Sequence, residues 1–243
     1  SYSGQFVSNR AEGWGTFRHI NGDLYEGNWH DDKAHGEGMY AHVDGTRFSG
    51  QWRHDQQAGE GREIWPDGTR YCGQYRDGAK SGIGRFLWSS GAKYEGDFMC
   101  DQIHGVGSYS WEDGRKYVGE WCNSQMHGYG VFSWADGRRY EGMYEEDQKS
   151  GFGVFTWPDG RRYAGQWRMG KQHGSAKYTC EGATRAGTWV DGARTTWDEN
   201  VAAVVDAAQR SMAASVASVA SARTFSEESS SPGSFSEPQT MDF

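Results

Sequence analysis

Short runs of alternating aromatic and small or polar residues recur along this chain at a fixed spacing. Between Tyr25 and Trp29, two aromatic residues flank a glycine, and polar residues fill the positions between them. A period of two is typical of a β-strand that buries one face. The leading aromatic residue returns every 23 residues without insertion or deletion, at Tyr2, Tyr25, Phe48, Tyr71, Tyr94, Tyr117, Tyr140 and Tyr163. The spacing predicts eight copies of one structural unit.

Other positions keep the same spacing. A Gly-x-Gly pair such as Gly36 and Gly38 follows the second aromatic residue, and a third aromatic residue follows that pair. Most units close on Asp-Gly, as at Asp44-Gly45, which is a strong signal for a hairpin whose two turn residues both have positive φ. We therefore expect two antiparallel strands per unit, the second one around residues 39–42. The fold class predicted is all-β: an elongated single antiparallel sheet of stacked 23-residue β-hairpins.

The pattern changes near the C-terminus. We assign residues 1–197 to the repeat solenoid, in which Arg185–Trp189 is a degenerate ninth unit. Apolar residues then follow helical spacing, which predicts a helix from about 198 to 222 within a capping or docking segment 198–223. That helix either covers the C-terminal end of the sheet or lies in its concave face, which we favour, or it docks to a partner through Val201, Val205, Met212 and Val216. The Ser/Glu-rich segment 224–243 has the composition of a flexible tail.

Composition supports an aromatic core. The 243 residues include 36 Gly, 12 Trp, 13 Tyr and 11 Phe, whereas only 35% are hydrophobic. A net charge of -8 argues against nucleic acid as a partner. We expect no membrane-spanning segment and no secretory signal, because no long apolar run is present. Four cysteines without C-x-x-C spacing favour a reduced, cytoplasmic setting.

Candidate chemistry is sparse. His35, His104, His127 and His173 share one repeat position, but Ala58, Ser81 and Ser150 occupy it in other units. No cysteine or carboxylate completes a ligand set, so we expect no metal. Neither a nucleophile elbow nor a phosphate loop appears, and we expect no catalysis, no cofactor and no small-molecule substrate.

Two rows of residues remain as candidate binding surfaces. The first is a row of tryptophans in the expected concave face, where a partner segment would lie: Trp65, Trp88, Trp111, Trp134 and Trp157. The second is a basic ladder: Arg115, Lys116, Arg138, Arg139, Arg161 and Arg162. The ladder would either bind the phosphates of anionic lipids or form cross-strand pairs with recurring acids such as Asp113, and the negative net charge favours pairing.

The repeat resembles a known family. Tyr25-Glu26-Gly27-x-Trp29, then His35-Gly36-Glu37-Gly38 and Asp44-Gly45, is similar to the MORN repeat, and so are the units that begin at Tyr94 and Tyr117. The resemblance covers about residues 2–183. It implies an elongated, curved sheet with a concave face, and roles as scaffolds in cytoskeletal and ciliary assemblies or as membrane tethers.

The resemblance also implies a function by analogy. We expect a non-catalytic protein-interaction scaffold of the cytoplasm and cytoskeleton, and most specifically a structural subunit of a ciliary or flagellar axoneme, such as a radial-spoke head. Its partners would be other proteins, bound through the concave face and the C-terminal helix. The alternatives are a phosphoinositide-binding membrane tether that uses the basic ladder and a regulatory subunit of a separate enzyme chain.

Overall fold

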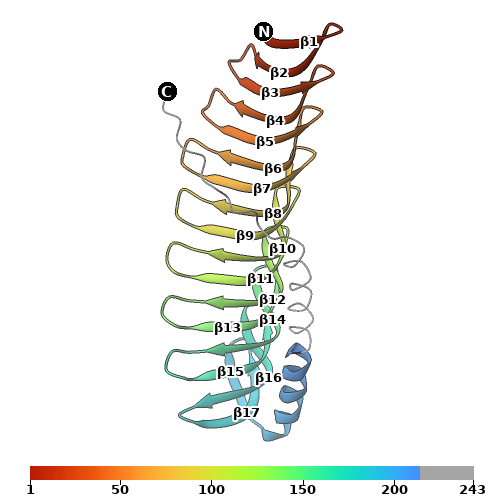
Figure 1. Ribbon diagram of the computed structural model, residues 1–243. Helices are drawn as coiled ribbons and strands as arrows, with labels where there is room; N and C mark the ends of the chain where they lie inside the picture. Colours follow the sequence, from red (N-terminus) through yellow and green to blue (C-terminus); the bar gives the residue numbers. More distant parts are fainter. Residues whose placement is uncertain (214–243) are drawn as a thin grey trace.

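The computed structural model describes residues 1–213, of which residues 2–197 form one long sheet of 18 strands (Figure 1). The strands are β1 (Tyr2–Val7), β2 (Arg10–Arg18), β3 (Leu24–His30), β4 (Lys33–Ala41), β5 (Arg47–Arg53), β6 (Gln56–Ile64), β7 (Arg70–Arg76), β8 (Ala79–Leu87), β9 (Lys93–Met99), β10 (Gln102–Ser110), β11 (Lys116–Cys122), β12 (Gln125–Ser133), β13 (Arg139–Glu145), β14 (Gln148–Thr156), β15 (Arg162–Arg168), β16 (Lys171–Cys180), β17 (Ala183–Val190) and β18 (Ala193–Trp197).

Every strand pairs antiparallel with the strand that follows it in the sequence, so the sheet is a simple meander. Pairing runs from β1 with β2 through β17 with β18, and Figure 1 shows the strands stacked in chain order along the molecule. The predicted fold class is confirmed, with two strands in each of eight units and a ninth, degenerate hairpin formed by β17 and β18.

The turns differ from the sequence prediction. The two-residue hairpin turn lies inside each unit, for example at Asp31-Asp32, where both residues have positive φ (48° and 63°). At Asp44-Gly45 only Gly45 has positive φ (96°), so the prediction of a two-residue Asp-Gly turn there is wrong. This connection is longer, since β4 ends at Ala41 and β5 begins at Arg47. Within it, the Asp44 carboxylate accepts a hydrogen bond from the Thr46 N–H at 2.8 Å, which stabilises the loop.

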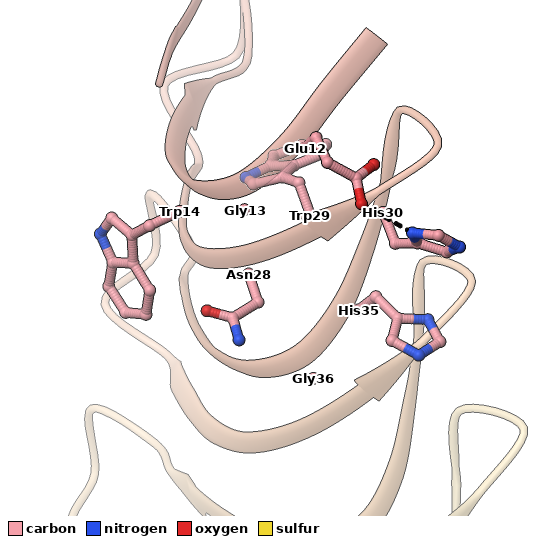
Figure 2. Close-up of a pocket in the computed structure, with 8 residues that line it drawn as sticks. All are labelled: Glu12, Gly13, Trp14, Asn28, Trp29, His30, His35 and Gly36. Atoms are coloured by element: carbon pink, nitrogen blue, oxygen red, sulfur yellow. Dashed lines mark hydrogen bonds and ion pairs between the residues drawn. The ribbon is translucent and has the colours of Figure 1, made fainter. Parts of the chain in front are cut away.

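The Gly-x-Gly pairs bend the second strand of each unit. Gly36 has a φ of 68°, and the register between β3 and β4 shifts opposite it, between Gly27 and Trp29. Such a bulge bends a strand and increases its twist. Figure 2 shows the ribbon turning sharply at Gly36 and at the equivalent Gly13. The second glycine is needed for space: a Cβ on Gly38 would lie within 2.7 Å of ring atoms of Tyr25.

The bends allow a single sheet to enclose its own core. Tyr117 has no exposed surface, and its ring lies edge-on to Trp121 and Tyr144 with centroids 5.0 and 5.3 Å away. Its hydroxyl donates to the carbonyl of Glu120 at 2.9 Å. Because the same pattern of edge-on rings repeats from unit to unit, it forms a continuous aromatic ladder. We call the face that carries these rings the inner face, and the opposite one the outer face.

The chain beyond β18 folds back onto the outer face. After the 3-10 helix η1 (Glu199–Val201), residues 202–213 are α-helical. Val205, which is 1% exposed, packs against Phe152, Val154 and Ala164 of β14 and β15. These side chains alternate with the inner-face residues of the same strands, so the helix packs on the outer face. The sequence led us to expect it in the concave face or over the C-terminal end of the sheet, and it lies in neither place. The rest of the predicted helix and the predicted tail 224–243 lie outside the described residues.

Candidate interaction surface

A second row of rings lies beside the core ladder on the inner face. The predicted tryptophans follow the even-numbered strands, and each is half-buried against the aromatic core. Trp111 lies 4.4 Å from Tyr109 and 5.3 Å from Phe132, measured between ring centroids, and similar contacts join its neighbours. The row includes the five predicted residues, Trp65, Trp88, Trp111, Trp134 and Trp157. It presents a continuous strip of partly accessible aromatic surface.

Half of the predicted basic ladder holds these tryptophans in place. The guanidinium of Arg138 lies 5.3 Å from the ring centroid of Trp134, and its Nε donates to Asp136 at 2.7 Å. Arg115 and Arg161 repeat both contacts, with Trp111 and Asp113 and with Trp157 and Asp159. The charge of these three arginines is thus already matched by a carboxylate of the same turn.

The other half of the ladder points elsewhere. Lys116, Arg139 and Arg162 begin odd-numbered strands one residue before a buried tyrosine, so they lie on the outer face. Arg139 pairs with Glu141, and together with Arg162 it lines a depression of about 320 Å³ next to Met212 of the C-terminal helix. The ladder is therefore divided between two sites instead of forming one stripe. Phosphate binding by either half stays a prediction.

Two inner-face lysines were not singled out by the sequence. Lys80 and Lys149 share one repeat position, which in other units holds Ala34, Ile103 or Met126. The Lys80 ammonium lies 2.7 Å from Glu63, which replaces the third aromatic residue of its unit. The Lys149 ammonium is surrounded by rings instead. A charged residue at a repeat position that is otherwise uncharged was the signal that could have found both.

The first units carry a shallow depression of about 420 Å³ at the bend of the strands. Figure 2 shows that His30 and Glu12 face each other there, at 2.8 Å, and this hydrogen bond raises the pKa of His30. The His35 ring makes an edge contact with His30, and its Nδ1 is buried without a hydrogen-bond partner. Among residues 1–213, no group of three or more His, Cys, Asp or Glu side chains is arranged to hold a metal ion.

The predicted docking residues of the helix are in part occupied within the chain. Val205 is buried and Met212 packs beside it, while Val201 is half-buried and Val216 lies outside the described residues. Lys177 of β16 pairs with Asp206 at 2.6 Å and fixes the helix to the sheet. Within the described part of the chain, no helix is long and apolar enough to cross a membrane.

With this geometry in view, the family model for the MORN repeat matches eight consecutive segments: residues 2–24, 25–47, 48–70, 71–93, 94–114, 117–138, 140–161 and 163–182. The chain belongs to the MORN-repeat family. Each MORN repeat therefore forms one hairpin of the curved sheet and places its aromatic residues on the inner face. Strands β17 and β18 continue the sheet past the last matched segment. The comparison with curated proteins finds no match.

Solved structures with some similarity include a Drosophila melanogaster SAS-4 (dCPAP) TCP domain in complex with a proline-rich motif of Ana2 (dSTIL). It has 11% sequence identity and a TM-score of 0.40, and the match covers 66% of this chain and 88% of that chain. The TCP10 domain of Danio rerio CPAP, in complex with a STIL peptide, has 13% identity and a TM-score of 0.28 over 82% of this chain and 99% of that one. TM-scores this low carry no argument about what the MORN chain binds.

Proposed function

We propose that this MORN-repeat chain is a non-catalytic scaffold that binds extended segments of other proteins along its inner face. The observation that carries the proposal is the continuous strip of half-buried tryptophans from Trp65 to Trp157. Flat, partly exposed aromatic side chains provide large contact area at a small cost in conformational entropy, and they are enriched at protein interfaces.

The repeat architecture suits a scaffold. Each unit packs only on its neighbours, so the sheet forms an elongated body whose length follows the number of units. The buried tyrosines and the paired arginines are committed to holding this body together, which leaves few side chains for chemistry. This distribution supports binding over catalysis as the role of the chain.

The finer part of the proposal is a place in the cytoskeleton, and specifically in a ciliary or flagellar axoneme such as a radial-spoke head. What supports it is the role of other MORN-repeat proteins, together with the near absence of any other structure in the described residues. An elongated subunit with a binding strip on one face would hold partner proteins at defined positions along an assembly.

The experiment compares three forms of the tagged chain in captures from ciliated cells, followed by mass spectrometry. The inner-face variant carries Trp111→His and Trp134→His, since His19 and His42 occupy the same position in the first two units and show that the fold accepts histidine. The control variant carries Arg85→Ser on the outer face, where the Arg85 side chain is 68% exposed.

We expect a set of captured proteins that the control retains and the inner-face variant loses, with axonemal proteins among them. Far-UV and near-UV circular dichroism would establish that all three forms are folded. If the inner-face variant captured the same proteins as the wild type, the inner face would not be the binding surface. If the lost proteins came from outside the cytoskeleton, the axonemal assignment would be wrong.

A further inference from the structure

Lys149 lies on the inner face with its ammonium enclosed by aromatic rings. Its Nζ is 5.4 Å from the ring centroid of Trp134 and 5.3 Å from that of Tyr140, and the rings of Phe155 and Trp167 lie at 5.8 and 5.5 Å. The side chain is half-buried. Within residues 1–213, no hydrogen bond or ion pair reaches this ammonium. Burial lowers the pKa of Lys149, and the nearby charge of Arg138 lowers it further.

Lys80 shows what the same position looks like when its charge is matched. The two lysines stand three units apart, but Lys80 lies 2.7 Å from Glu63 and 3.9 Å from Asp101. In the surroundings of Lys149, the residue equivalent to Glu63 is Phe132 and the residue equivalent to Asp101 is Gly170. Both carboxylates are thus missing from the later unit, although its rings remain.

The rings around Lys149 compensate for only part of this loss. Cation–π contacts offset only part of the cost of withdrawing an ammonium group from water, because a charge removed from water also needs hydrogen-bond acceptors. The equivalent positions are occupied by Ile103 in one unit and Met126 in the next, so the fold does not require a lysine here. A cation that the architecture does not need, placed beside the tryptophan strip, is suited to recognise an anion on that strip.

We propose that Lys149 is the selectivity position of the inner face, where it binds an Asp or Glu side chain of an extended protein segment that lies on the tryptophan strip. The proposal rests on the scaffold function above and deepens it. The carboxylate would take the place that Glu63 takes beside Lys80. Aliphatic or aromatic residues of the segment, on either side of the acid, would pack on Trp134 of the preceding unit and on Trp157 of the unit that contains Lys149.

The test uses a randomised peptide library displayed on phage and selected on the full chain. We expect wild-type protein to enrich peptides that share one Asp or Glu next to apolar residues. The variant Lys149→Met copies the residue found at Met126, so it keeps the fold. It should bind the enriched peptides about tenfold or more weakly, since a charge-assisted hydrogen bond is lost. Lys149→Glu should instead enrich peptides with Lys or Arg at the shared position.

The matched control is the double variant Lys80→Met with Glu63→Phe, which removes the paired lysine together with its own carboxylate and should leave peptide binding unchanged. If Lys149→Met enriched the same acidic peptides with the same affinity, Lys149 would not be the selectivity position, although the scaffold proposal would stand. If no form of the folded protein enriched any peptide, both proposals would fail. Binding that appeared only after deletion of residues 224–243 would show that the chain's own acidic tail is the occupant, which would also overturn the proposal of an external partner.

Discussion

On the inner face, Tyr94 and Tyr140 have nearly the same surroundings, although they stand two units apart. Each is fully buried, and each lies edge-on to the next aromatic residue of its strand with ring centroids 5.2 Å apart. On the outer face the residues that follow them differ. Glu95 is exposed, and its carboxylate lies 4.0 Å from Nε of Arg85, whereas Glu141 is half-buried and accepts a hydrogen bond from the Tyr129 hydroxyl.

This comparison shows that the inner face holds the fold together, whereas the outer face is where the units differ from one another. Every inner ring must fit the ring of the next unit, so a change there is felt along the stack. Within residues 1–213, the outer face has such a neighbour where the C-terminal helix covers Phe152 and Val154. The outer face can therefore vary from unit to unit, while the rings of the inner-face core ladder stay aromatic and the inner face varies at other positions, such as those of Glu63, Lys80 and Lys149.

The largest expected effect is alkaline unfolding driven by the inner face. Burial raises the pKa of five fully buried tyrosines far above 10, namely Tyr71, Tyr94, Tyr117, Tyr140 and Tyr163. Because the folded-state pKa is the higher one, this stability is complete below pH 10 and is lost as pH rises above it. Each tyrosine contributes about 1.4 kcal/mol per pH unit, and together they give a slope of roughly 7 kcal/mol per pH unit.

Circular dichroism and the absorbance of tyrosinate, followed together from pH 9 to 12.5, would measure this transition. We expect cooperative unfolding, in which the five phenols ionise only as the sheet is lost. Ionisation of most tyrosines near pH 10 with the sheet intact would contradict the enclosed inner face.

The next effect is a clash on the inner face. A Cβ on Gly107 would lie 2.5 Å from ring carbons of Tyr94, whose ring has no space to move. We expect Gly107→Ala to lower the free energy of unfolding by about 3 kcal/mol in urea titrations. Gly68→Ala is the control, because no atom lies within 4 Å of that position and only its φ of 88° opposes alanine. A cost of about 1 kcal/mol is expected there. Equal costs at the two positions would argue against tight packing over the tyrosine.

On the outer face, the helix gives the largest expected effect. Val205→Asp places an unpaired charge against Phe152 and Val154, so the helix should detach and the free energy of unfolding should fall by about 2 kcal/mol. Limited proteolysis should then cut between β18 and residue 213. The adjacent Val204 is 58% exposed, and Val204→Asp should change neither measurement. Similar protease resistance in both variants would show that the helix does not depend on this contact.

The smallest effect is expected at the edge of the tryptophan strip. Arg138 and Asp136 are 43% and 53% exposed, so their ion pair contributes little in water. We expect Arg138→Gln to lower the free energy of unfolding by less than about 1 kcal/mol, including its lost contact with Trp134. A loss as large as that of Gly107→Ala would place this row among the residues that hold the architecture.

Several features of the protein could be predicted from its sequence. The 23-residue spacing and the alternation within Tyr25–Trp29 predict the strands, their antiparallel order and the aromatic core, and the structure has all three. This is possible because the units contact only their neighbours, so the same contacts recur at the same spacing. The sequence also identified the tryptophan strip as a row, since its members share one repeat position.

Other features depend on the tertiary structure alone. The turn at Asp31-Asp32 contains no glycine, and its positive φ values follow from the twist that the paired strands impose. The helix docks on the outer face, where Val205 packs against Phe152, Val154 and Ala164 of β14 and β15, and sequence spacing does not reveal this contact. Lys80 pairs with Glu63, which is 17 positions away in the sequence, because the bent strands bring the two together. The residue 17 positions before Lys149 is Phe132, so within residues 1–213 that lysine has no equivalent partner. A repeat in the sequence specifies the contacts that all units share. The contacts between residues that differ from unit to unit are decided only by the folded sheet, which brings those residues together.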